Sequence, residues 1–237
     1  YYTASILQEE DGAKIVAILE WDGALVDPKG LDVNDVFQYK CDNKGGVKGY
    51  PRAEYVEDSK SLLEMECDIL IPAAMEAVIN RGNAAKIKAK LIGEAANGPV
   101  TFAAETVLKE KGVVIIPDVY LNAGGVTVSY FEWIKNLSHI RFGRMNRRYE
   151  EGQSQLLIEA IEKTGNKVPV ELVEKLSQGA DEIALVRSGL DDTMRKAFQD
   201  IRERFWSNEK IPNYRTAAMA IAIEKIHTSY RTMGIYP

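Results

Sequence analysis

The chain has 237 residues, of which 46% are hydrophobic and 27% are charged. This composition is ordinary for a globular protein, and the length suffices for one large or two small domains with a buried core. The net charge of −5 and the sequence pI of about 5.3 argue against a nucleic-acid-binding surface. No apolar run approaches the length of a membrane-spanning segment.

Cysteine and histidine usage argues against a metal site. Cys41 and Cys67 fit neither a disulfide framework nor a Cys-based metal site, which indicates a reducing compartment. His139 and His227 lie far apart in the sequence and show no ligand spacing. We therefore expect no bound metal.

The chain predicts alternating strands and helices up to residue 133. Its predicted elements are, in order, the end of a helix (3–13), a short strand buried on both faces (14–20), a turn at Asp22-Gly23, a capped helix (32–37), a strand (68–72), a helix punctuated by residues 80–83, a strand (91–95), a helix (101–111) and a strand (112–121). Alternation at these lengths predicts an α/β fold with a doubly wound, mostly parallel sheet.

The rest of the chain is predicted to be mainly helical. Residues 153–163 have apolar side chains at helix-face spacing, and two longer helices are predicted at 188–206 and 214–232. A weaker strand signal lies at 167–173.

The most informative segment is NAGGVTVSYFEW (Asn122–Trp133), which follows the strand predicted at 112–121. Ligands of open α/β sheets bind beyond the carboxyl ends of strands. A polar Asn122 followed by the bare backbone of Gly124 and Gly125 is therefore expected where a cofactor ring would lie. The alternative is an ordinary strand-to-helix turn.

This segment, CDILIPAA (Cys67–Ala74) and GEAANGPVT (Gly93–Thr101) together resemble the cofactor domain of hexameric glutamate dehydrogenases. The resemblance continues through SGL (Ser188–Leu190) and YRTAAMAIAIEKI (Tyr214–Ile226), so it covers nearly the whole chain. It implies a Rossmann-like domain that binds NAD or NADP. It also implies the oxidation of L-glutamate to 2-oxoglutarate and ammonia, a homo-hexamer, and a mitochondrial matrix location, or otherwise a cytoplasmic one.

The resemblance also implies three parts of the chain. Residues 1–133 would form the cofactor-binding domain, 134–187 a connecting helix with an antenna-like insertion, and 188–237 a pivot helix with the C-terminal helices. The family's first strand and its Gly-rich fingerprint would precede Tyr1, so we expect the chain to be part of a longer protein. The family's catalytic lysines and proton-relay aspartate belong to an amino-terminal domain, so no catalytic residue is expected here.

Glu20 ends the first predicted strand, where dinucleotide-binding folds place an acid that accepts hydrogen bonds from the adenosine ribose. Its charge would also oppose a 2′-phosphate. An acid at the start of an exposed turn is the alternative interpretation. Trp21 stands where animal-type relatives are expected to have a small polar residue, which leaves the preference between NAD and NADP open.

Small or amide side chains follow the later strands. Ala73 and Ala74 would leave room for flat cofactor groups, although ordinary strand-to-helix packing explains them equally well. The amides of Asn97 and Asn122 both donate and accept, and the resemblance implies that they line the nicotinamide site.

Val126 and Ser129 are the candidate substrate residues. By resemblance, Ser129 would bind a carboxylate of the amino acid, with Val126 against its side chain. Ser129 as a helix N-cap is the alternative, and the two roles are compatible.

Ile140–Val186 resembles the antenna of animal-type enzymes in a shorter form. Its apolar positions Leu156, Leu157, Ala160 and Ile161 would then contact other subunits, whereas a helix packed on its own domain would bury them internally.

Ser188–Arg204 resembles the pivot helix. Arg187 and Ile183 replace a His and a Lys of animal-type enzymes, so nucleotide effectors are possible partners but inhibition by GTP is expected to be weak.

Two other functions stay open. A related dehydrogenase acting on leucine, valine or phenylalanine is the enzymatic alternative, and a non-catalytic structural remnant is the alternative from another class. The antenna-like segment and the full NAGGVTVSYFEW string favour glutamate.

Overall fold

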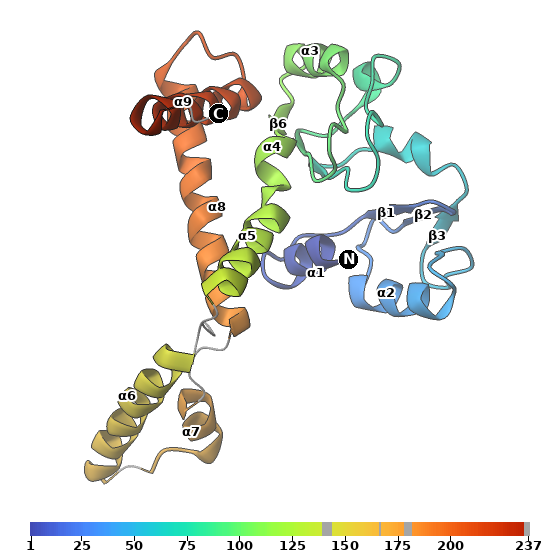
Figure 1. The fold of residues 1–237 in the computed structure, drawn as a ribbon. Helices are drawn as coiled ribbons and strands as arrows, with labels where there is room; N and C mark the ends of the chain where they lie inside the picture. Colours follow the sequence, from blue (N-terminus) through green and yellow to red (C-terminus); the bar gives the residue numbers. More distant parts are fainter. Residues whose placement is uncertain (139–143, 166, 178–181, 235–237) are drawn as a thin grey trace. The chain divides into compact units, whose positions relative to one another are not determined.

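A computed structural model describes residues 1–138, 144–165, 167–177 and 182–234. The chain divides into two compact units, Tyr1–Ile115 and Ile116–Pro237 (Figure 1). The first unit combines strands and helices, and the second is built from helices. Among the described residues, no helix is long and apolar enough to cross a membrane. The functional boundaries at 133 and 187 stay predictions, because compactness alone does not test them.

An antiparallel sheet forms the first half of unit 1. Its strands lie in the order β1-β2-β3, and Leu25 on the central strand pairs with Ile18 and Tyr55. The turn Trp21-Asp22 joins the first two strands. The elements of this half are α1 (Tyr2–Glu9), β1 (Ala17–Glu20), β2 (Gly23–Val26), α2 (Val33–Asp42) and β3 (Glu54–Val56).

Helix α2 begins as its sequence predicts. The Asp32 side chain accepts a hydrogen bond from the amide of Asp35 at 3.0 Å, which satisfies one of the free N–H groups at the helix start. The helix then buries its apolar side chains against the sheet. This core contains Leu25, Leu31, Val36, Val47 and Tyr50.

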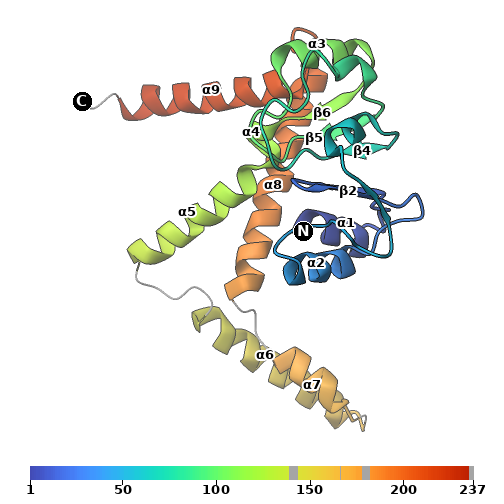
Figure 2. The same ribbon diagram turned by 90° about the vertical axis from the view of Figure 1, so that its right-hand side faces the viewer.

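A sheet with strand order β4-β5-β6 forms the second half of unit 1 (Figure 2). β4 and β5 are parallel, with Ile69 opposite Leu91. Thr101 caps α3 by accepting a hydrogen bond from the amide of Ala104 at 3.3 Å. The elements are η1 (Ser59–Glu64), β4 (Ile69–Leu70), η2 (Ala84–Lys86), β5 (Leu91–Gly93), α3 (Phe102–Glu110) and β6 (Val114–Ile116). The core contains Ile79, Ala84, Ile87, Ala89, Ile92, Val100, Ala104 and Leu108.

The predicted α/β class with a parallel sheet is confirmed, but three details of unit 1 differ. The first strand pairs antiparallel with β2 instead of entering a parallel sheet. The helix predicted after Pro72 is absent from residues 73–90, where the described chain is irregular apart from the short 3-10 helix η2 and a single bridge at Ile79. The strand predicted at 112–121 ends at Ile116, because Pro117 has no N–H to donate to a sheet and instead begins a helix.

In unit 2, α8 packs against α4, α5 and α9, whereas α6 and α7 pack against each other. Its core joins Ile201 of α8 to Ala217 and Ala218 of α9. Asn213 caps α9 through the amide of Thr216 at 2.8 Å. The helices are α4 (Asp118–Leu121), α5 (Ala123–Ser138), α6 (Arg144–Lys163), α7 (Val170–Ser177), α8 (Glu182–Ser207) and α9 (Tyr214–Met233).

The long helices of unit 2 are where the sequence predicts them, and one prediction is wrong. The strand signal at 167–173 runs into α7, because a short apolar run has the same appearance in a strand and in a helix. The antenna-like segment 140–186 includes residues 140–143, 166 and 178–181, and His139 directly precedes it; these positions lie outside the described residues. Its described part consists of α6, α7 and the start of α8.

Candidate functional site

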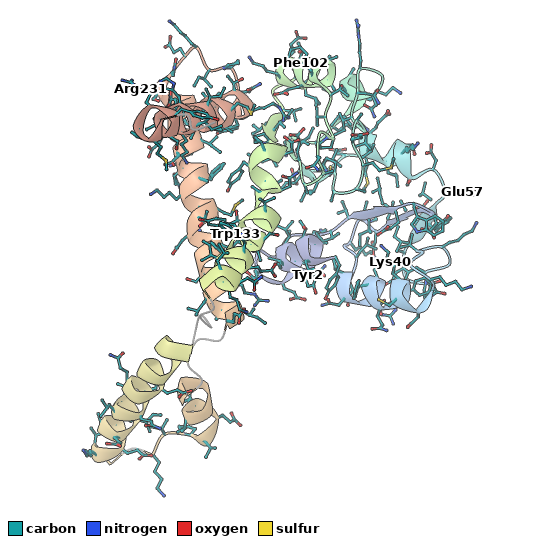
Figure 3. The ribbon with its side chains drawn as sticks, viewed as in Figure 1. Tyr2, Lys40, Glu57, Phe102, Trp133 and Arg231 are labelled. Atoms are coloured by element: carbon teal, nitrogen blue, oxygen red, sulfur yellow. The ribbon has the colours of Figure 1, made fainter. Side chains whose placement is uncertain are left out.

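Glu20 is the last residue of β1, as predicted, and its carboxylate forms an ion pair with the ammonium of Lys40 through Oε1. Lys40 extends from the last turn of α2 (Figure 3). The two side chains are 25% and 31% exposed, so the pair lies at the surface and is only partly covered. A carboxylate has about four acceptor positions, so an ion pair through one oxygen still permits hydrogen bonds from ribose hydroxyls.

Asp22, the second residue of the turn Trp21-Asp22, holds the turn beside Glu20 in place. Asp22 Oδ2 accepts hydrogen bonds from the backbone amides of Val47 at 2.8 Å and Lys48 at 3.1 Å. The hydroxyl of Tyr55 donates to the carbonyl of Asp22. The Tyr55 ring also covers Gly23, where a Cβ would lie 2.5 Å from it. The turn backbone is therefore fixed, while the side chain of its first residue, Trp21, is 79% exposed.

Ala73 and Ala74 lie beyond the carboxyl end of β4 and are exposed, with the bare backbone that the sequence predicts. The preceding Pro72 is buried, and its carbonyl accepts hydrogen bonds from the amides of Ala95 at 3.1 Å and Ala96 at 2.9 Å. These bonds attach the segment after β4 to the segment after β5.

Asn97 lies in that neighbouring segment. The amide of Ala77 donates to the carbonyl of Gly98 at 2.9 Å, and Ile79 forms a parallel bridge with Val100. The segments containing Ala73 and Asn97 therefore lie side by side beyond the carboxyl ends of two parallel strands. This is the edge at which α/β sheets bind their ligands.

Glu94 is a residue of this edge that the sequence alone does not single out. It follows β5 directly, and its side chain is completely buried. Burying a carboxylate is costly, so an acid in such a position is typical of a functional or tightly organised region. The only signal in the sequence is the acidic residue within GEAANG.

Asn122 lies at a helix end in unit 2, which corrects the prediction that it ends a strand. It is the C-cap of α4, and α5 begins at the next residue. A Cβ on Gly124 would lie 3.7 Å from the Leu190 side chain of α8, and a Cβ on Gly189 would lie 3.6 Å from the Phe131 ring of α5. These are ordinary contact distances, so the two glycines lie where α5 and α8 pack together, and the NAGG and SGL motifs are neighbours.

Val126 and Ser129 lie on the exposed surface of α5. Val126 is 74% exposed, and Trp133, two turns further on, is 56% exposed (Figure 3). Ser129 lies inside α5 and its hydroxyl donates to the carbonyl of Gly125 at 3.0 Å, so the alternative that it caps a helix is wrong. To bind a substrate carboxylate, this hydroxyl must give up that internal hydrogen bond, because a carboxylate only accepts.

The candidate residues thus divide between the two units. Glu20, Ala73, Ala74 and Asn97 belong to unit 1, and Asn122, Val126 and Ser129 to unit 2. The chemistry of the first group fits a dinucleotide. A carboxylate accepts from ribose hydroxyls, exposed backbone allows flat groups to approach, and an amide both donates and accepts.

Metal ligands and a lysine base were the other chemistry to look for among the described residues. They contain no group of three or more His, Cys, Asp or Glu side chains that could hold a metal ion. The hydrogen bond and charge of Asp68 raise the pKa of Lys90 above its ordinary value, which is opposite to the change that turns a lysine into a general base. The expectation that the chain supplies no catalytic residue stays a prediction.

The arrangement defines an α/β protein with candidate ligand-binding residues at the carboxyl ends of its strands. Solved structures have the same fold. The hetero-hexameric glutamate dehydrogenase of Thermus thermophilus superposes with a TM-score of 0.69 at 22% identity, over 98% of this chain and 45% of that one. The glutamate dehydrogenase of Peptoniphilus asaccharolyticus gives 0.59 at 28% identity, over 96% and 43%. The predicted Rossmann-like fold is thereby confirmed.

Sequence comparison identifies the family. The model of the glutamate/leucine/phenylalanine/valine dehydrogenases matches residues 1–185, and the chain belongs to this family. It is 50% identical to the mitochondrial glutamate dehydrogenase of Dictyostelium discoideum over 98% of this chain and 46% of that protein. A probable glutamate dehydrogenase of Sinorhizobium fredii is 42% identical over 95% and 51%. The chain therefore spans about half the length of these curated relatives.

Proposed function

We propose that the protein to which this chain belongs oxidises L-glutamate to 2-oxoglutarate and ammonia with NAD or NADP, and that this chain supplies the cofactor-binding half. The observation that carries the proposal is the 50% identity to a glutamate dehydrogenase over 98% of the chain. The residues at the carboxyl ends of β1, β4 and β5 support it, because their chemistry suits a dinucleotide.

The chain's residues have distinct proposed roles. Glu20 accepts hydrogen bonds from the adenosine ribose. Ala73 and Ala74 leave space for flat groups, and Asn97 and Asn122 bind the nicotinamide side. The roles of Asn97 and Asn122 rest on amide chemistry, which can serve both the ribose and the carboxamide.

Val126 and Ser129 are proposed to hold the substrate. Val126 contacts the aliphatic part of glutamate and the Ser129 hydroxyl donates to a carboxylate, which fixes Cα for loss of its hydride. A bound nicotinamide supplies the hydride acceptor. Hydrolysis of the resulting iminium needs a base that activates water, and this role is proposed for residues outside the chain.

Substrate competition tests this function. The intact protein is assayed by nicotinamide absorbance with L-glutamate, leucine, valine and phenylalanine in turn. The proposal requires the highest kcat/KM with glutamate. Faster oxidation of leucine, valine or phenylalanine would identify a dehydrogenase for that amino acid. Intact cofactor binding without oxidation of any of the four would identify a non-catalytic subunit.

We also propose that the intact protein is a homo-hexamer of the mitochondrial matrix. The exposure of Leu156 at 68% and Leu157 at 54% on α6 supports a role for this helix in contacts between subunits. Sedimentation of the intact protein tests the assembly, and fractionation of its native cells tests the location. The weak inhibition expected from Arg187 and Ile183 is tested by adding GTP to the glutamate assay, where strong inhibition would show that other residues bind the nucleotide.

A further inference from the structure

We propose that the indole of Trp21 is the surface on which the adenine ring of the cofactor stacks. This inference rests on the proposed function, since it assigns one more contact within the same cofactor site. Trp21 directly follows Glu20, and its side chain is 79% exposed. Adenine is attached to the ribose that Glu20 is proposed to hold, so the base lies within reach of the next residue.

The structure presents the indole on a fixed support. The turn after Trp21 is held by the hydrogen bonds of the Asp22 carboxylate to the amides of Val47 and Lys48, and by the Tyr55 hydroxyl. Binding to such a turn does not require ordering of its backbone, which removes part of the entropy cost of association. An exposed side chain on a fixed backbone is what a stacking surface requires.

The residue type also suits the ligand. Indole has the largest aromatic face among the side chains, and nucleobases stack on such faces without needing specific hydrogen bonds. Glu20 and Lys40 supply charge at the ribose but no apolar surface for the base. Trp21 provides that surface at the adjacent position.

An isolated exposed aromatic residue is common on protein surfaces, so the proposal needs a matched control. Trp206 provides it, because it is 74% exposed and belongs to α8 in the other unit. Loss of an exposed indole alone has the same effect at both positions. Only a contact with adenine would make the Trp21 and Trp206 substitutions differ in their effect on nucleotide binding.

Calorimetric titration of the intact protein with AMP, NAD and nicotinamide mononucleotide tests the proposal. Trp21→Ala is expected to weaken AMP and NAD about tenfold, in line with the loss of one base stacked on an aromatic ring. Nicotinamide mononucleotide, which lacks adenine, is expected to bind with unchanged Kd. Trp21→Phe should retain most of the AMP affinity, and Trp206→Ala should change none of the three.

Two results would overturn the assignment while leaving the proposed function intact. One is an unchanged Kd for AMP in Trp21→Ala, and the other is an equal weakening of AMP and nicotinamide mononucleotide, which would indicate general damage. A wild-type protein that binds neither NAD nor AMP would overturn the proposed function and this inference together. Melting temperatures of the variants, expected to match the wild type, show that each is folded.

Discussion

Replacement of Glu20 by serine tests whether one ion pair sets the choice between NAD and NADP. In the folded chain the Glu20 carboxylate is paired with Lys40, and the two side chains are 25% and 31% exposed. Glu20 therefore has two proposed effects: it accepts hydrogen bonds from the ribose, and it holds the charge of Lys40. Glu20→Ser removes both and leaves the Lys40 ammonium available to a 2′-phosphate.

The size of the effect follows from the interactions exchanged. A hydrogen bond to a charged group contributes roughly 1.5–3 kcal/mol, which corresponds to about tenfold to a hundredfold in affinity. We expect kcat/KM for NAD to fall within this range and kcat/KM for NADP to rise. Since both side chains reach solvent, loss of the ion pair itself should lower the free energy of unfolding by no more than about 1 kcal/mol.

The assay compares kcat/KM for the two cofactors at fixed glutamate in the wild type, Glu20→Ser, Lys40→Met and the double variant. Lys40→Met should lower the use of NADP and leave that of NAD nearly unchanged, and the double variant should lose the NADP gain of Glu20→Ser. An unchanged ratio in Glu20→Ser would refute the reasoning, because Glu20 would then not face the ribose. A double variant that keeps the full gain would show that Lys40 does not bind the phosphate.

Three further predictions concern other parts of the chain. Ser129→Ala should lower kcat/KM for glutamate roughly tenfold to a hundredfold with an unchanged Kd for NAD. A kcat/KM equal to that of the wild type would show that Ser129 does not bind the substrate. Leu157→Asp, at a 54% exposed position, should weaken subunit association in sedimentation but preserve the melting temperature of the chain. Ile158→Asp, at a buried position, should lower the melting temperature. A large loss of melting temperature in Leu157→Asp with the assembly intact would contradict the antenna interpretation. Burial and the hydrogen bond to Asp35 raise the pKa of Tyr50 from 10.0 to about 12. The unfolded state therefore loses this proton first, and the free energy of unfolding should fall as pH rises from 10 to 12. Tyr50→Phe should reduce this fall in denaturant titrations, and an equal fall in the variant would contradict the prediction.

Features fixed by neighbouring residues could be predicted from the sequence. The helix at Asp32 is capped as predicted, and a helix begins at Thr101, whose side chain proves to cap it, because a cap needs only a side-chain oxygen and an amide three residues further on. The helices at 188–206 and 214–232 were also predictable, since their apolar spacing extends over many turns.

Features that depend on strand partners could not be predicted in the same way. The apolar run at 14–20 is compatible with either strand direction, and only the hydrogen bonds to β2 make it antiparallel. The run at 112–121 predicts one strand because Val and Ile dominate its first half. Pro117 divides it, and the second half forms the helix α4, which moves Asn122 from a strand end to a helix end.

The cofactor site combines both kinds of information. The sequence places Glu20 at a strand end, and an isolated acid there predicts repulsion of a 2′-phosphate. Lys40 lies twenty positions further along and reaches the carboxylate because α2 packs on the same small sheet. Since the ion pair neutralises much of the acid's charge, selectivity against NADP should be weaker than Glu20 alone implies. Preference between the two cofactors is therefore a property of the pair, and variants of both residues are needed to assign it.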